Sequence, residues 1–267
     1  MLTIMNLSLE VTRNCNFRCS HCLKGEPENK NLDFNVLGKI FKPGVAIESL
    51  QFTGGEVFLV PDVLHKIINF IINSEALISQ VSIVTNGTCY TKGIEADLEK
   101  LGKYVNRCNL MMDEDVNPTP IILELSVDQY HIQQLDYIKS TNKELFDKYW
   151  KNLQLLKKTK LFLDARNITQ IFDKGRAKDL NITKYQPVAA KMLFTSGSFW
   201  TEKLMHVTAI DIHVDGKVKN TKDNILNKDI EDIITDNGIR CEDDDELLKF
   251  YEENIHEMLH PKLSKKI

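Results

Sequence analysis

The sequence predicts an α/β protein with a mostly parallel sheet, followed by a smaller C-terminal part that contains a hairpin. Two observations lead to this prediction. Segments with strand and helix periodicity alternate along the first two thirds of the chain, and the last third contains the turn sequence DGKV between apolar residues. Alternating strands and helices are typical of parallel sheets, because each pair of parallel strands needs a crossover connection.

The first strand is expected in NLSLEV, where Leu7, Leu9 and Val11 recur at period two and a cysteine-rich loop follows. The helix over 61–73 has Pro61 in its first turn, and a capping box of Thr141 and Glu144 is expected to begin the helix over 141–158. Further strands are predicted at 46–53, 80–85, 121–127, 161–166 and 187–194, and further helices at 33–41 and 91–104.

Composition excludes some classes of partner. The 267 residues carry a net charge of only -4, so no overall basic field indicates nucleic acid or anionic lipid. The N-terminus lacks the features of a signal peptide, and no apolar run is long enough to span a bilayer. We therefore expect a cytoplasmic protein with no membrane and no nucleic-acid partner.

Three of the six cysteines, Cys15, Cys19 and Cys22, fall within the stretch RNCNFRCSHCLK. Disulfides are not expected in a reducing compartment, so metal binding is the leading interpretation. A closed zinc site needs four ligands, and His21 would complete it only with strain in so short a loop. An iron–sulfur cluster prefers thiolates, and three of them would leave one iron of a 4Fe–4S cube open for a ligand.

This spacing resembles the C-x-x-x-C-x-aromatic-C signature of the radical S-adenosylmethionine (SAM) enzymes, with His21 at the aromatic position. The resemblance covers about two thirds of the chain. It implies a partial (β/α)6 TIM-like barrel over residues 1–200, one 4Fe–4S cluster held by the three cysteines, SAM on the open iron, and a low-potential electron donor such as flavodoxin or ferredoxin. His21 would lie against the adenine of SAM, or would be a solvated loop residue without a role.

Further motifs follow the later strands, where barrel enzymes gather their active sites. Gly54, Gly55 and Glu56 match the Gly-Gly-Glu motif that binds the methionyl ammonium group in the family, although Gly-Gly pairs are also common in plain turns. Thr85 and Asn86 stand in a TNG turn at the position of another familiar cofactor contact.

Two sites carry an open alternative. Ser126 and Asp128 share one face of a strand and resemble Ser-x-Asp pairs that bind the ribose or the carboxylate of SAM, yet Asp128 is also suited to cap the next segment. Arg176, in a Gly-Arg-Ala segment found in relatives with a C-terminal extension, would clamp a carboxylate or stand in an exposed basic turn.

The segment over 201–267 resembles a degenerate SPASM or twitch-like extension made of a hairpin and helices. Lys219 and Asn220 stand where such extensions carry a thiol, so no auxiliary cluster is expected. We interpret Cys89, Cys108 and Cys241 as ordinary thiols.

The predicted function is reductive cleavage of SAM and abstraction of a hydrogen atom from a substrate, with a peptide preferred over a small metabolite by fold-level analogy. Two alternatives stay open. One is an activating enzyme that installs a glycyl radical on a partner protein, and the other is a non-catalytic iron–sulfur protein that serves as a redox sensor.

Overall fold

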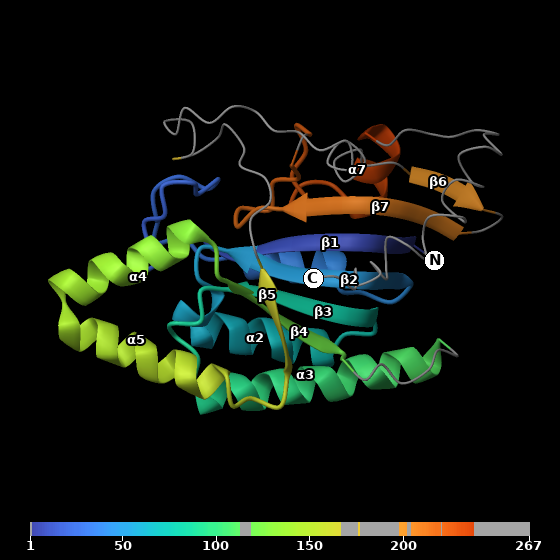
Figure 1. Cartoon of the computed structure of the whole chain (residues 1–267). Helices are drawn as coiled ribbons and strands as arrows, with labels where there is room; N and C mark the ends of the chain where they lie inside the picture. The colour runs from blue at the N-terminus through green and yellow to red at the C-terminus, as the bar shows by residue number, and fades with distance from the viewer. Residues whose placement is uncertain are drawn as a thin grey trace, which may run out of the picture.

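A computed structural model describes residues 2–112, 119–166, 176, 198–201, 204–219 and 221–237. Its seven-stranded sheet has the order β5-β4-β3-β2-β1-β7-β6, so β5 and β6 form the two edges (Figure 1). The strands are β1 (Leu2–Thr12), β2 (Val45–Gly54), β3 (Leu77–Thr85), β4 (Ile121–Ser126), β5 (Phe162–Arg166), β6 (Ser198–Thr201) and β7 (Leu204–Ile212). The helices are α1 (Leu37–Ile40), α2 (Pro61–Ile72), α3 (Lys92–Met111), α4 (Gln129–Thr141), α5 (Lys143–Leu156) and α7 (Ile230–Asn237), with 3-10 turns at Phe34–Val36 and Val57–Leu59.

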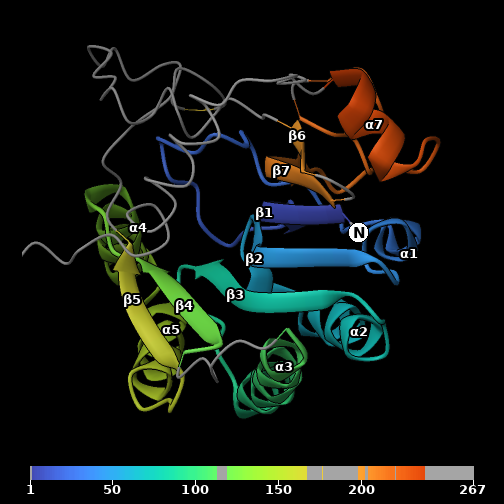
Figure 2. The ribbon, with the colours of Figure 1, turned by 90° about the vertical axis from the view of Figure 1, so that its right-hand side faces the viewer.

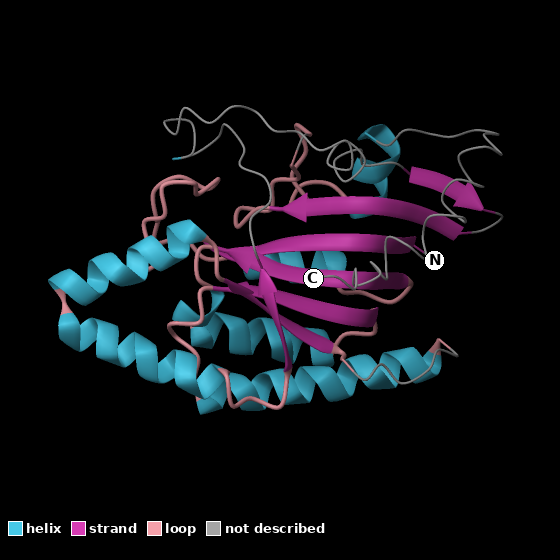
Figure 3. Cartoon of the chain, in the orientation of Figure 1, coloured by secondary structure: helices cyan, strands magenta, loops and turns pink. Residues whose placement is uncertain are grey.

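All strands except β6 run parallel, and the helices between them lie beside the sheet (Figures 1 and 3). The sheet is open rather than closed into a full barrel, which confirms the predicted α/β fold of partial TIM-barrel type. Parallel strands bring their carboxyl ends to the same edge, so the loops after β1, β2, β3 and β4 are neighbours.

The hydrophobic core lies against one face of the sheet. Leu9, Phe52, Ile83 and Leu123 are paired across β1 to β4, and all four are fully buried. They belong to the same core as the inner face of α2, and Figure 2 shows α2 and α3 packed beneath the sheet. The residues one position earlier in β1 to β3, Ser8, Gln51 and Ser82, form a polar row on the opposite face, which the period-two pattern of β1 predicted.

Three predicted helices differ from the structure at their boundaries. The helix predicted over 91–104 continues to Met111 as α3. The segment over 33–41 forms a 3-10 turn and the single-turn helix α1 instead of one continuous helix. The cap of α5 is Asn142, whose side chain accepts from the backbone N–H of Leu145, and not Thr141. Thr141 instead ends α4, a helix that the sequence did not predict, and its hydroxyl donates to the carbonyl of Tyr137.

The predicted hairpin over 209–224 is only partly a separate unit. Its first half belongs to β7, which runs parallel to β1 within the main sheet. A turn at Gly216 (φ +78°) then reverses the chain, and Val218 bridges back to Ile212. The division into domains 1–200 and 201–267 therefore stays a prediction.

Three expectations fall on residues outside the described ranges: the strand over 187–194, Cys241 and Asn220. Among the described helices, none is both long enough and apolar enough to cross a membrane.

Candidate active site

One cavity of about 260 Å³ lies at the carboxyl ends of the strands. The loops after β1, β2 and β3, the end of β4 and the first turn of α4 all contribute to its wall. Of the predicted site residues, it is lined by Cys15, Cys19, His21, Cys22, Gly54, Gly55, Glu56, Thr85, Asn86, Ser126 and Arg176. Asp128 is the one predicted site residue that does not line it.

The three thiols of the cysteine loop are free and face this cavity together. Phe17, buried against Tyr149, anchors the loop between the first two cysteines. Burial raises the pKa of Cys15 and of Cys19 to about 12. Thiols in such a place become thiolates only when a nearby positive charge, such as a metal, stabilises the anion. Three soft donors with no fourth cysteine among the lining residues fit an iron–sulfur cluster that keeps one iron open.

Gly54, the last residue of β2, and Gly55 after it let the chain lie directly against the end of β1 and the start of the cysteine loop. A Cβ atom on Gly54 (φ +140°) would stand 2.1 Å from the carbonyl oxygen of Thr12, and one on Gly55 would stand 2.1 Å from that of Asn14. In the space saved, the N–H of Gly55 donates to Thr12 O at 2.6 Å, and the N–H of Glu56 donates to Asn14 O at 2.8 Å. The glycines thus serve close contact between two loops, a role the sequence did not reveal.

Glu56 is buried, with 1% of its surface exposed, and the described groups that donate to its carboxylate are all neutral. The donors are the hydroxyl of Thr85 at 2.7 Å and the backbone N–H groups of Asn86 and Phe58 at 2.7 and 3.1 Å. Burial raises the pKa of Glu56 to about 7, although these hydrogen bonds oppose the shift. A ligand cation beside this carboxylate would restore its charge.

The TNG turn after β3 connects Glu56 with the cysteine loop. The amide of Asn86 donates to Asn16 Oδ1 at 2.9 Å, and its oxygen accepts from the hydroxyl of Thr88 at 2.6 Å. The side chains of Thr85 and Asn86 are therefore committed to protein groups, and their direct contact with a cofactor stays a prediction.

Asp128 caps α4, which was the alternative left open by the sequence. Its Oδ1 accepts from the backbone N–H groups of Tyr130 and His131, and its Oδ2 lies 2.6 Å from Nδ1 of His131. Ser126, two residues earlier at the end of β4, does line the cavity. The sequence did not single out His131. This residue lies three positions after the N-cap residue Asp128, where a capping-box side chain reaches back to the N-cap residue.

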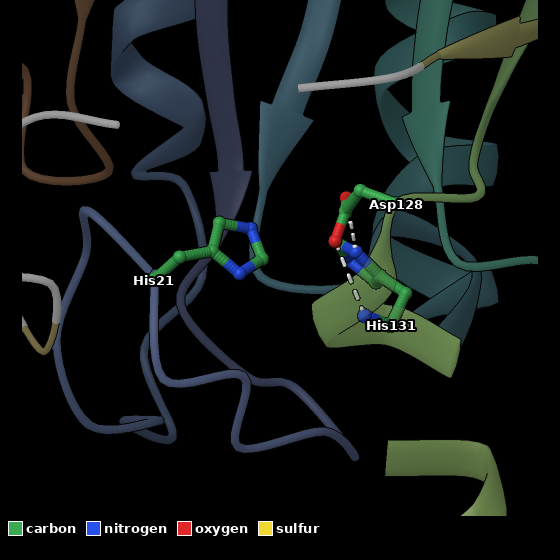
Figure 4. A group of neighbouring side chains, drawn as sticks. All are labelled: His21, Asp128 and His131. Carbon is green, nitrogen blue, oxygen red and sulfur yellow. Dashed lines mark hydrogen bonds and ion pairs between the residues drawn. The ribbon is translucent and has the colours of Figure 1, made fainter. Parts of the chain in front are cut away.

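His21, Asp128 and His131 form a cluster whose ligand atoms all lie within 4.8 Å of one another (Figure 4). The ring of His21 lies 4.5 Å from that of Tyr130 and 5.3 Å from that of His131. Burial lowers the pKa of both histidines and so favours the neutral form of each ring. The bond between Asp128 and His131 already uses two of the atoms that a metal would need, which favours a hydrogen-bonded pair over a metal site.

Arg176 contacts the backbone of the cysteine loop, and its predicted clamp on a ligand carboxylate stays a prediction. Its Nε donates to the carbonyl of Cys19 at 2.9 Å, and its backbone N–H donates to the carbonyl of Cys22 at 2.9 Å. The predicted exposed basic turn is wrong for this side chain, because only 16% of it is exposed.

A second buried carboxylate, Glu10, was not found from the sequence. It lies near the end of β1 and contacts Nζ of Lys24 at 3.0 Å, Nε of Arg13 at 3.4 Å and Nδ1 of His213 at 3.1 Å. Arg13 and Lys24 flank the three cysteines, while His213 follows β7. Glu10 therefore fixes both ends of the cysteine loop to the sheet.

The remaining described cysteines lie apart from this set. Cys108 is buried in the core, and the thiol of Cys89 is contacted by the amide of Asn16 at 3.6 Å. Burial raises the pKa of Cys89 to about 11. Neither lines the cavity.

Several known proteins are similar to this chain. The molybdenum cofactor biosynthesis protein moc-5 of Caenorhabditis elegans is 25% identical over 232 residues, which cover 80% of this chain and 35% of that protein. A GTP 3',8-cyclase of Geobacter sulfurreducens is 34% identical over 116 residues, 40% of this chain and 33% of that protein. The chain thus spans about a third of the length of these curated relatives. Among solved structures, anSMEcpe with bound AdoMet and the Cp18Cys peptide is 15% identical with a TM-score of 0.43, covering 88% of this chain and 81% of that one.

A family model described as the radical SAM superfamily matches residues 9–163, more than half of the chain and the whole run from the middle of β1 into β5. This range includes the cysteine loop and the loops after β2, β3 and β4. The chain therefore belongs to the radical SAM superfamily, whose cofactors are a 4Fe–4S cluster and SAM.

Proposed function

We propose that this chain is an active radical SAM enzyme that removes a hydrogen atom from its substrate. The observation that carries the proposal is that three free thiols and the buried carboxylate of Glu56, which has no cationic partner among the described residues, lie in the wall of one cavity. A cluster that served only as a redox sensor or a structural staple would have no use for a cation site beside it.

Each part of the wall has a proposed role. Cys15, Cys19 and Cys22 would hold three irons of the cluster, and Glu56 with the carbonyls of Gly54 and Gly55 would bind the ammonium group of SAM. When bound, the cluster supplies an electron that splits SAM into methionine and a 5′-deoxyadenosyl radical, which takes a hydrogen atom from the substrate. The protein holds the sulfonium against the cluster and excludes water from the cavity.

Further residues would bind or position the nucleoside part of SAM. His21 would lie against the adenine, and Ser126 would bond the ribose or the carboxylate. Asp128 would act through His131, since it contacts that ring and does not line the cavity. Thr85 and Asn86 would keep Glu56 and the cysteine loop in register through the bonds described above.

The substrate is proposed to be a peptide, on the analogy of the Gly-Arg-Ala segment and the hairpin. A nucleotide is the second candidate, because several curated relatives are named GTP 3',8-cyclases. The electron would come from a cytoplasmic flavodoxin or ferredoxin. An activating enzyme for a glycyl-radical partner would use the same cluster, and would differ in co-purifying with a large protein substrate.

Anaerobic reconstitution tests the proposal. With dithionite and SAM, the wild-type protein should release 5′-deoxyadenosine, and Cys15→Ala, Cys19→Ala and Cys22→Ala should each abolish both cluster binding and release. Cys89→Ala is the matched control, since its thiol lies outside the cavity wall and should be dispensable. Stimulation by GTP or by candidate peptides then distinguishes the substrates. A cysteine-loop variant that keeps full iron content and normal cleavage would overturn the assignment.

A further inference from the structure

Arg176 brings a positive charge close to the proposed cluster position, in addition to its hydrogen bonds with the cysteine loop. Its backbone and its Nε bond the carbonyls of two of the three cysteines. Its Nη1 is buried and makes no hydrogen bond within the described part of the chain. Among the described residues, the one carboxylate that pairs with it is that of Glu26 at 3.5 Å, and this side chain is 61% exposed and so is largely screened by water. Within the described part of the chain, no buried carboxylate neutralises this positive charge.

The guanidinium lies beside the three thiols. Arg176 lines the same cavity as Cys15, Cys19 and Cys22, and its Nε is bonded to the backbone of Cys19 itself. Because the Arg176 side chain is only 16% exposed, solvent and salt weaken the interaction of its charge with this site much less than they weaken that of a surface arginine. The charge thus favours extra negative charge at the place where the cluster would be bound.

We propose that Arg176 raises the reduction potential of the cluster by holding a positive charge against the cysteine loop. The proposal rests on the function proposed above, in which these cysteines hold the cluster. Reduction moves one electron from the external donor to the cluster, so the cluster gains one negative charge and the donor is oxidised. A fixed positive charge stabilises the reduced form more than the oxidised form, and net charge is one of the factors that set cluster potentials.

The test is a redox titration of the reconstituted full chain, followed by the electron paramagnetic resonance signal of the reduced cluster without SAM. Arg176→Gln removes the charge, and Arg176→Met removes it while keeping a long apolar stem. At the wild-type midpoint, both should show a reduced-to-oxidised ratio about tenfold lower, which is a shift of about 59 mV to more negative potential for a one-electron couple. Arg176→Lys keeps the charge and should stay close to the wild type.

Arg18→Gln is the matched control. Arg18 lies between Cys15 and Cys19 and carries the same charge, but its side chain is 75% exposed, so its removal should leave the midpoint nearly unchanged. Equal midpoints in the wild type and in either neutral variant, at equal iron content, would overturn the inference and leave Arg176 a merely structural clamp. A wild-type protein that takes up no iron would overturn the proposed function and this inference with it.

Discussion

Glu10 and Glu56 are two glutamates near the carboxyl ends of neighbouring strands, and both are 1% exposed. Their surroundings differ in charge. Burial raises the pKa of Glu10, but hydrogen bonds and charge from His213 and Lys24 outweigh it and hold that pKa at about 2. The described donors to Glu56 are all neutral, so burial prevails and raises its pKa to about 7.

This difference in charged partners distinguishes a carboxylate with a structural role, Glu10, from one suited to bind a cationic ligand, Glu56. The chain itself neutralises Glu10, which ties Arg13 and Lys24 to the sheet on either side of the cysteines. No cationic side chain in the described part of the chain forms an ion pair with Glu56. The Glu56 carboxyl group nevertheless lines the same cavity as the three thiols. A cationic ligand group is the missing partner, and the ammonium of SAM has this chemistry.

The largest effect is expected where the position of Glu56 is disturbed through its backbone. Gly55→Ala would put a Cβ atom 2.1 Å from the carbonyl oxygen of Asn14, so the two loops must separate. We expect a loss of more than about 3 kcal/mol in the free energy of urea unfolding and a loss of iron uptake. Gly93→Ala in α3 is the control, because its nearest contact is 3.8 Å away, and it should leave both quantities unchanged or slightly improved.

Glu10→Gln should come next, because it leaves three basic groups without their buried anion. We expect about 3 kcal/mol of lost stability at pH 7, measured by urea unfolding of the iron-free protein. The low pKa of Glu10 also gives an acid signature. Its contribution is present above the ordinary value of 4.5 and is lost as the pH falls toward 2. Glu28→Gln, which removes an exposed partner of Arg13, should change little.

Glu56 should show the opposite dependence on pH. Its folded pKa of about 7 lies above its ordinary value of 4.5, so its contribution is complete below pH 4.5 and is lost as the pH rises through 7. The iron-free wild type should therefore lose roughly 2 kcal/mol more stability than Glu56→Gln between pH 5 and pH 8. Parallel curves for the two proteins would show that Glu56 is charged at neutral pH without a ligand.

The smallest effect is expected at Asp128, which shapes the wall through the start of α4. Asp128→Asn keeps a side-chain oxygen for the cap, whereas Asp128→Ala loses it, and the two should differ by about 1 kcal/mol in thermal or urea unfolding. A difference near zero would mean that the contact with His131, rather than the cap, is what Asp128 provides.

Local patterns were sufficient to predict β1 to β5, while β6 was not predicted. The period-two spacing of Leu7, Leu9 and Val11 predicted which face of β1 is buried, and the three cysteines and the Gly-Gly-Glu turn were correctly brought to one cavity. The helix α4 was missed because its polar and apolar residues are only weakly separated around the helix axis.

Local sequence patterns could not predict contacts between distant parts of the chain. Glu10 meets His213, which lies 203 residues further along, and no local signal connects them. The same holds for Arg176 on the carbonyl of Cys19, 157 residues earlier. The close contact of Gly54 and Gly55 with Thr12 and Asn14 also depends on a distant segment of the chain, so the sequence did not reveal it beside the predicted ligand contact.

The most direct test of the central claim, an open iron next to an uncompensated carboxylate, is the electron paramagnetic resonance spectrum of the reduced, reconstituted protein with and without SAM. We predict about four iron atoms per chain and a spectrum that changes when SAM is added to the wild type, with the change weakened in Glu56→Gln. A full complement of iron with a spectrum that is indifferent to SAM would contradict the account.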